Sequence, residues 1–215
     1  MLGLRVERGY FQRGVALLAG VDEVGRGPWA GPVVAAAVVV GPDVRQVSAL
    51  RGVNDSKQLS ERRRDELAAA ILCLLPCAVG AASTREIDRI NIRRATILAM
   101  RRALARLPLE VDAVIVDGLP VPELGWPHDA LVDGDAKCFA IACASIVAKT
   151  VRDRLMRRLA PRYPEYGWEH NCGYGTRDHQ RALARCGPTP HHRRSFMPVS
   201  QRDLFEEIRH PLAGD

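Results

Sequence analysis

Short apolar runs separated by turn-forming residues predict the strands of a sheet. Residues 15–21 and 33–40 are continuous apolar runs of strand length, and the second is rich in β-branched residues. Gly25 to Pro28 lie between them and favour a turn, so the two runs predict a hairpin. Similar short runs predict three further strands at residues 77–82, 113–116 and 130–132.

Apolar positions at helical spacing lie between and after these runs. Ser60 favours a helix start, and the helical periodicity continues to residue 75, just before Pro76. Ser83 and Glu86 form a capping-box pattern for a short helix, and Asn91 is placed to cap another. A long helix is expected at about 137–159, with two more at 176–186 and 200–209.

This order of elements predicts an α/β fold. The opening hairpin makes the sheet mixed, and we expect five strands flanked by helices, followed by a helical C-terminal segment. No linker divides the chain, so we expect a single domain over residues 1–215, with an α/β core at about 15–160 and the helical segment at about 161–215.

Charge adds a basic surplus to an otherwise ordinary globular composition. Lysine and arginine outnumber the acids by 31 to 25, which gives a formal net charge of +6. Such a surplus favours a polyanionic partner through phosphate contacts, although a basic surface without that partner is the alternative. No run is long and apolar enough to span a bilayer, and the first ten residues carry no signal-peptide pattern, so we expect a cytoplasmic protein without membrane partners.

The six cysteines form no C-x-x-C pair, and without a secretory signal we expect reduced thiols that are mostly buried. Zinc is the alternative for part of the set, but the spacing of the four candidates fits no common zinc pattern: Cys172, Cys186, His191 and His192.

Four acids occur where strands end or a helix begins. Asp22 and Glu23 are expected to close the first strand, Asp117 the fourth, and Asp135 precedes the long helix. Sites in α/β sheets form just beyond strand ends, so these acids can converge. Converging carboxylates repel one another unless cations neutralise them, and Mg²⁺ and Mn²⁺ prefer oxygen ligands. The set therefore predicts a site for two divalent ions that supports phosphodiester hydrolysis.

Each acid also has a simpler interpretation. Asp and Gly follow strands because they make turns, and Asp135 could be only a helix cap. Asp22 and Glu23 are harder to explain this way, because two adjacent acids after an apolar strand have no packing role. Neighbours on a strand point to opposite faces, so we expect the backbone to leave strand geometry there if both acids share one site.

Two glycine-rich loops and a basic helix are candidates for substrate contacts. Backbone groups of Gly25, Arg26 and Gly27 could bond a ribose 2′-hydroxyl, and the alternative is a plain turn with a solvated arginine. Tyr174 could pack on a sugar, or pack under its own loop. Three basic residues could meet phosphates, although charge runs are commonly solvated faces: Lys57, Lys149 and Arg152.

The residues from about 15 to 199 resemble the bacterial ribonuclease HII family of type 2 ribonucleases H. The resemblance begins with D-E-V-G-R-G at 22–27 and A-G-P-V-V at 30–34, which together are highly specific. Further motifs follow in the family's order: N-D-S-K at 54–57, E-I-D at 86–88, V-D-G at 116–118, G-D-A-K at 134–137, A-S-I at 144–146, R-D-R at 152–154 and G-Y-G-T at 173–176.

The resemblance implies a ribonuclease H-like fold and an endonuclease that acts on RNA:DNA hybrids and on ribonucleotides in duplex DNA. It implies cleavage 5′ of the ribonucleotide, leaving 3′-hydroxyl and 5′-phosphate ends, with Mn²⁺ or Mg²⁺ held by Asp22, Glu23, Asp117 and Asp135. The loop at Gly25, Arg26 and Gly27 matches the family's ribose-reading loop. Tyr174 matches its sugar-contacting tyrosine.

Three residues depart from the family's pattern. Asp133 and Cys172 replace common lysines, which removes positive charge near the site, and Cys138 replaces a common serine. Two other functions compete with this one: a related nuclease or recombinase that cuts DNA without needing ribose, and a non-catalytic nucleic-acid-binding module. Monomer is the simplest assembly.

Overall fold

The computed structural model describes every residue except 1, 43–49, 55, 57 and 201–215. Its five-stranded sheet has the order β3-β2-β1-β4-β5. The strands are β1 (Leu18–Val24), β2 (Val33–Val40), β3 (Cys77–Ala82), β4 (Ala113–Asp117) and β5 (Asp129–Leu131). The β1–β2 and β2–β3 pairs are antiparallel, and the β1–β4 and β4–β5 pairs are parallel. The predicted hairpin and mixed sheet are confirmed.

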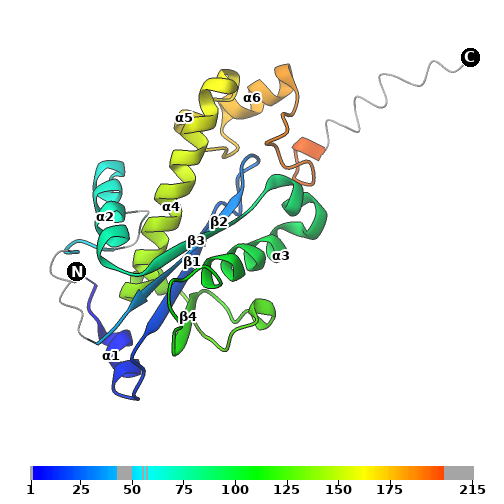
Figure 1. Cartoon of the computed structure of the whole chain (residues 1–215). Helices are drawn as coiled ribbons and strands as arrows, with labels where there is room; N and C mark the ends of the chain where they lie inside the picture. The colour runs from blue at the N-terminus through cyan, green and yellow to red at the C-terminus, as the bar shows by residue number, and fades with distance from the viewer. Residues whose placement is uncertain (1, 43–49, 55, 57, 201–215) are drawn as a thin grey trace, which may run out of the picture.

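Helices cover both faces of this sheet. One face carries α1 (Arg5–Phe11), α2 (Glu61–Leu74) and α4 (Phe139–Leu159), and the other carries α3 (Thr84–Leu104) (Figure 1). Two buried apolar clusters, one on each face, form the core. The central strands carry apolar side chains on both faces, because helices cover both faces of the sheet.

The predicted helix starts are confirmed at three positions. The Ser60 side chain accepts a hydrogen bond from the Arg63 N–H, and Ser83 and Glu86 form the expected capping box. Asn91 has a non-helical backbone (φ 66°, ψ 165°) inside α3, and its side chain accepts from the Arg94 N–H. Thus α3 consists of two helical segments that meet at a kink, with Asn91 capping the second.

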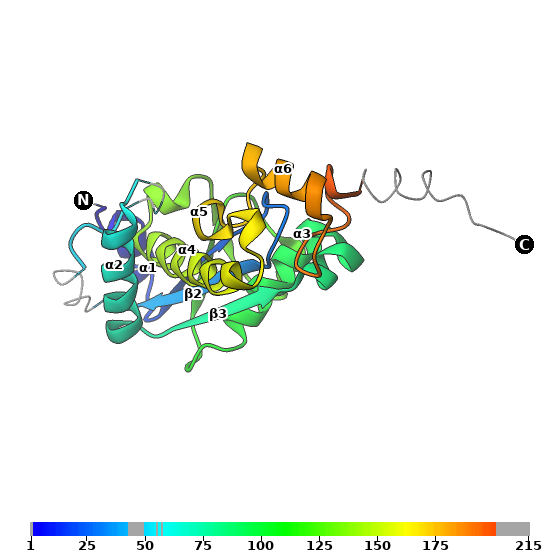
Figure 2. The same cartoon turned by 90° about the horizontal axis from the view of Figure 1, so that it is seen from above.

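The described residues after α4, 160–200, pack at one end of that helix. Short 3-10 turns at Ala160–Arg162 and Pro164–Tyr166 lead into α5 (Trp168–Asn171) and α6 (Arg177–Cys186), which Figure 2 shows above the sheet beside the β1–β2 loop. The predicted helix at 200–209 lies outside the described residues, apart from its first position. Among the described helices, none has the length and apolar character needed to cross a membrane.

Two expectations about the first strand are wrong. Asp22 and Glu23 do not close β1 but lie inside it, and the backbone there keeps regular strand pairing. The reason is that β2 remains hydrogen-bonded to β1 as far as the Val24–Val34 pair, which holds both acids in extended geometry.

The N-terminal helix α1 was not expected from the sequence. Its Glu7 is fully buried and accepts hydrogen bonds from the Ala140 N–H and the Cys138 thiol, both at 3.0 Å. Cys138, not Asp135, is the N-cap residue of α4, and Asp135 lies one turn earlier in a 3-10 turn at Gly134–Ala136. A carboxylate from another helix therefore satisfies an N–H at the start of α4.

Candidate active site

The candidate site lies where the parallel strands β1 and β4 end. Pairing between them stops at Val21–Val116, because β4 turns away at Gly118, which has a φ of +89°. β1 continues beyond this point along β2 only. The edge of β1 that β4 leaves uncovered is the place where Asp22 and Glu23 project.

The two adjacent acids of β1 point to opposite faces of the sheet. Asp22 faces α4, where the Ser145 hydroxyl is its hydrogen-bond partner, and Glu23 faces the side of α3. Asp117 follows Val116, the last residue of β4 that pairs with β1, and therefore faces α4 as Asp22 does. Since the sheet ends here, Glu23 reaches the same cavity from the other side of the edge.

All four predicted acids line one cavity of about 300 Å³. Asp135 reaches it from the 3-10 turn before α4, and the Gly134 N–H donates to Asp117 Oδ1 at 2.7 Å, which joins that turn to the end of β4. The lining residues come from six separate parts of the chain: Asp22, Glu23, Val24, Ser56, Asp117, Asp135, Ser145, Lys149 and Tyr174.

Burial and repulsion from neighbouring acids both disfavour the charged forms of the two acids of β1. Asp22 is 6% exposed, and its pKa is raised well above the usual value by burial and then by the charges of Glu23 and Asp117. Burial also raises the pKa of Glu23, although Arg26 opposes this shift from 3.2 Å. Oxygen donors that repel one another in a buried cavity suit a hard divalent cation, which would offset the repulsion.

The acids border the cavity without forming a closed ligand shell. Within the described residues, no three His, Cys, Asp or Glu side chains are grouped tightly enough to hold an ion as they stand. Magnesium-type sites typically take a few carboxylates and complete their coordination with water and substrate phosphate.

The two predicted ribose-contacting loops lie against each other at this cavity. Tyr174 lines it and is 41% exposed, so it does not pack under its own loop. The Trp29 N–H donates to the Gly173 carbonyl at 2.8 Å, which ties the Tyr174 loop to the chain just after Gly27. Arg26 is exposed and pairs with Glu23.

The three residues predicted to bind phosphate differ in their surroundings. Lys149 lines the cavity, with its ammonium 5.8 Å from the Tyr174 ring centre and 2.9 Å from Asp153. Lys57 lies outside the described residues. Arg152 is not placed to meet a phosphate, because it is fully buried and donates to the carbonyls of Ala30, Pro32 and Cys172.

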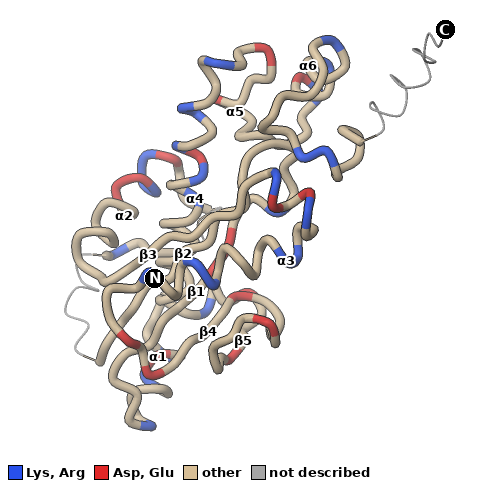
Figure 3. The backbone as a smooth tube through the Cα atoms, turned by 45° about the vertical axis from the view of Figure 1, so that its right-hand side comes forward, with Lys and Arg blue, Asp and Glu red and all other residues tan. Residues whose placement is uncertain are grey.

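Much of the basic charge on α4 is paired with acids of α2. Arg154 lies 3.4 Å from Asp65, and Arg157 lies 2.8 Å from Glu61. Figure 3 shows blue and red positions interspersed on these two helices. This face of α4 therefore matches the solvated-face alternative better than a phosphate-binding surface.

Sequence reasoning gave no role to several residues that shape the site. Ser145 bonds Asp22, and its hydroxyl is 2.9 Å from that of Ser56. Ser145 lies four residues before the predicted Lys149 on α4 and so shares its face, a spacing that could have indicated Ser145 as well. Arg193 is fully buried beside the Gly25 loop, and its sequence context gave no sign of this.

Two buried, neutral histidines support the Tyr174 loop through hydrogen bonds. The Thr189 N–H donates to His192 Nδ1, His192 Nε2 is 3.0 Å from His179 Nε2, and His179 Nδ1 is 2.9 Å from the Tyr174 carbonyl. This series of hydrogen bonds is consistent only if His192 carries its proton on Nε2 and His179 carries its proton on Nδ1. Burial lowers the pKa of both rings, that of His192 to about 3.

We expect the free energy of unfolding to fall as the pH drops below about 6.5. The pKa of folded His192 is depressed, so its stabilising contribution is complete above the unfolded value and is lost between pH 6.5 and about 3. Each pH unit in that window should cost up to about 1.4 kcal/mol from this ring. Urea unfolding at several pH values measures the slope, which His192→Gln should reduce and the exposed control His170→Gln should not. An unchanged slope in His192→Gln would contradict the assignment.

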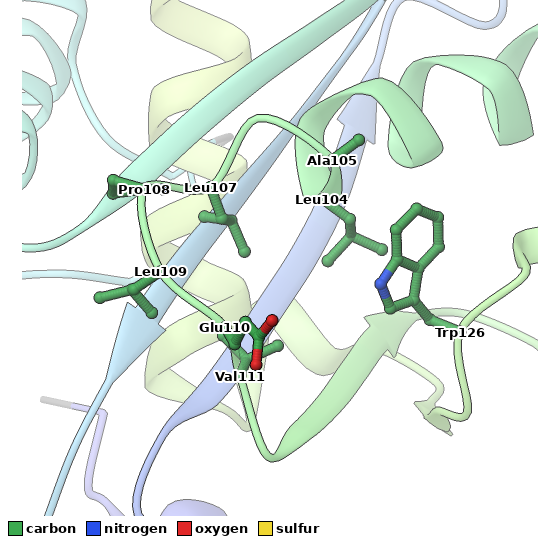
Figure 4. Close-up of a pocket in the computed structure, with 8 residues that line it drawn as sticks. All are labelled: Leu104, Ala105, Leu107, Pro108, Leu109, Glu110, Val111 and Trp126. Carbon is green, nitrogen blue, oxygen red and sulfur yellow. The ribbon is translucent and has the colours of Figure 1, made fainter.

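A larger cavity of about 550 Å³ lies at the other end of β4 (Figure 4). It is formed by the chain between α3 and β4, with Trp126 opposite Leu104, and Glu110 is its one charged lining residue among the described residues. It has no set of acids and is formed mainly by residues that precede β4, whereas Asp117 is the last residue of that strand. A third cavity under α3 adjoins the acidic site and shares Glu23 and Asp117 with it.

Comparison with known proteins gives a consistent result. The family model described as "Ribonuclease HII" matches residues 19–199. A protein named ribonuclease HII from Paramagnetospirillum magneticum is 52% identical over 189 residues, which cover 88% of this chain and 94% of that protein. Another of the same name from Cereibacter sphaeroides is 53% identical over 203 residues, covering 94% of this chain and 93% of that protein.

Solved structures agree with the fold. Ribonuclease H2 from Pyrococcus horikoshii matches with a TM-score of 0.74 and 29% identity, covering 90% of this chain and 99% of that one. The ribonuclease HII of a PCNA complex from Archaeoglobus fulgidus matches with a TM-score of 0.70 and 28% identity, covering 84% and 95%. Bst-RNase HIII in complex with Mn²⁺, at 24% identity, a TM-score of 0.72 and coverage of 90% and 71%, supports the fold alone.

Proposed function

The chain belongs to the ribonuclease HII family and is a metal-dependent ribonuclease H endonuclease, and we propose that it cuts 5′ of ribonucleotides embedded in duplex DNA and hydrolyses the RNA strand of RNA:DNA hybrids. The observation that supports this most is the convergence of Asp22, Glu23, Asp117 and Asp135 on one cavity that Tyr174 borders. Four acids from two strands and one turn have no common packing role there.

These acids are the residues that would hold two Mn²⁺ or Mg²⁺ ions. When bound, such ions polarise the scissile phosphate, help to ionise the attacking water and stabilise the leaving oxygen. The carboxylates of β1 and β4 fix the position of the cut, because they lie on rigid, paired strands. The proposed cleavage would leave a 3′-hydroxyl end and a 5′-phosphate end.

The remaining residues of the cavity would select and orient the substrate. The exposed backbone at Arg26 and Gly27 would hydrogen-bond the 2′-hydroxyl, which distinguishes RNA from DNA. The Tyr174 ring would pack on the adjoining sugar, and the Lys149 ammonium would meet a phosphate. The substrate on this proposal is a nucleic-acid duplex bound by a monomer.

A labelled duplex with one embedded ribonucleotide tests the function. We expect cleavage on the 5′ side of the ribonucleotide with Mn²⁺ or Mg²⁺, and none with chelator, because the acids cannot act without cations. Gel analysis against size standards maps the cut and its ends. Equal cutting of an all-DNA duplex would favour a nuclease that ignores ribose, and no metal-dependent cleavage of either duplex would favour a non-catalytic binding module.

A further inference from the structure

Arg193 is a buried cation whose partners are backbone carbonyls of the Gly25 loop. Its guanidinium donates to Gly31 O at 3.0 Å, to Arg26 O at 2.8 Å and to Gly25 O at 2.5 Å. It is fully buried, and its own N–H donates to the Trp29 carbonyl. Burial and the nearby charge of Arg152 lower its pKa to about 9, so it still carries its charge at neutral pH.

These contacts fix the direction of two N–H groups. In a trans peptide the carbonyl and the following N–H point in opposite directions. Because Arg193 holds the carbonyls of Gly25 and Arg26 toward the interior, the N–H groups of Arg26 and Gly27 point outward. Both of these residues are exposed, whereas Gly25 is buried. In the described part of the chain, neither N–H donates to a backbone carbonyl.

A second buried arginine anchors the other end of the same loop. Arg152 of α4 donates to Ala30 and Pro32 on one side and to Cys172, just before the Tyr174 loop, on the other, each at 3.0 Å. Gly25 has a φ of +88°, and a Cβ there would lie 2.1 Å from Arg152 Nε. Contacts with Arg193 and Arg152 on its buried side therefore hold the loop at both ends.

We propose that Arg193 is a positioning residue for ribose selection, which sets the outward N–H groups of Arg26 and Gly27 in the direction that a 2′-hydroxyl requires. This inference rests on the proposed role of that loop. An arginine suits the task because its planar guanidinium presents several donors in a fixed geometry, and a lysine at the same place keeps the charge but not the pattern.

The test compares Arg193→Lys with Arg194→Lys, its exposed neighbour, in the full-length chain. Affinities for a duplex with one ribonucleotide and for the same duplex in all-DNA form are measured in an Asp22→Asn background, so that nothing is cut. We expect the ratio of the two affinities to fall about tenfold in Arg193→Lys, the effect of one or two misplaced hydrogen bonds. The affinity for all-DNA duplex should not change, and Arg194→Lys should keep the full ratio.

Kinetics give a second measurement of the same property. With Asp22 intact, Arg193→Lys should raise KM on the ribonucleotide substrate by about the same tenfold and should also lower kcat, because a misdirected 2′-hydroxyl contact weakens binding and misplaces the substrate at the acids. A folded Arg193→Lys or Arg193→Gln with an unchanged affinity ratio would overturn the proposal. So would failure of both variants to fold, because the residue would then be structural. Equal affinity of the parent protein for both duplexes would instead reject the proposed role of the loop.

Discussion

Asp22→Asn is expected to abolish cleavage while leaving the chain at least as stable as the unsubstituted protein. Asparagine keeps an oxygen that can accept from Ser145 and from the Glu23 N–H, which lies 2.7 Å from Asp22 Oδ1. It removes the negative charge that a divalent ion requires. We expect activity to fall by at least about 10²-fold, the lower range for loss of one electrostatic contact to a transition state.

Stability separates this outcome from simple misfolding. Burial and the charges of Glu23 and Asp117 already raise the pKa of Asp22, so a neutral side chain relieves repulsion in the absence of metal. The melting temperature in chelator should therefore stay equal or rise. Added Mn²⁺ should raise the melting temperature of the unsubstituted protein but have little effect on Asp22→Asn, because binding to the folded state is what stabilises it.

Asp133→Asn is the matched control, since it makes the same chemical change one turn away from the site. Asp133 is exposed, pairs with Lys137 at 3.5 Å and does not line the cavity. It should keep most of the activity. If Asp22→Asn retained more than a few per cent of activity, or if both variants lost it equally, the assignment of Asp22 as an essential acid would fail.

The strands and most helix starts were predictable because their signals are local. Continuous apolar runs indicated all five strands, and Ser60, Ser83 and Asn91 marked helix starts through hydrogen bonds within their own first turns. The ordered motifs indicated the acids by resemblance. Their meeting at one cavity depends on where β4 stops pairing with β1, which is a property of the sheet and not of either strand alone.

The features that sequence reasoning missed depend on partners far along the chain. Helix α1 has only seven residues, too few for a clear period, and Glu7 is buried because it meets the start of α4 more than 130 residues later. Arg152 and Arg193 look like surface or phosphate-binding arginines in sequence. Their actual partners are carbonyls of the loop around Gly25 and Ala30, and no local pattern encodes such contacts.

Gly20→Ala is expected to cause the largest loss of stability among single-methyl additions on β1. A Cβ at Gly20 would lie 2.3 Å from the Ala140 carbonyl carbon and 2.5 Å from the Ile141 nitrogen, both backbone atoms of α4 that cannot rotate away. The helix must therefore move off the strand. Overpacking of this kind typically costs about 1–3 kcal/mol and sometimes more, and contact with backbone places Gly20→Ala at about 3 kcal/mol.

The same displacement should reach the active site, which makes activity a second readout. Gly20 and Asp22 point to the same face of β1, and Ser145 lies one turn after Ile141 on α4. Moving α4 outward separates Asp22 from Ser145 and from Asp135 in the turn before that helix, so kcat should fall even at temperatures where the variant is folded. Urea denaturation and steady-state kinetics measure the two effects separately.

Gly9→Ala provides the control, because it adds the same methyl group where nothing lies within 4 Å. Gly9 is inside α1, so alanine should raise the free energy of unfolding by up to about 1 kcal/mol through helix propensity. If the free energy of unfolding falls in Gly20→Ala and rises in Gly9→Ala, close contact with α4 determines the outcome, and not the added methyl group itself. A Gly20→Ala variant within about 0.5 kcal/mol of the unsubstituted protein, the range of ordinary surface substitutions, would mean that α4 does not rest on β1 at this residue. The arrangement of Asp22 and Asp135 across that contact would then need another explanation.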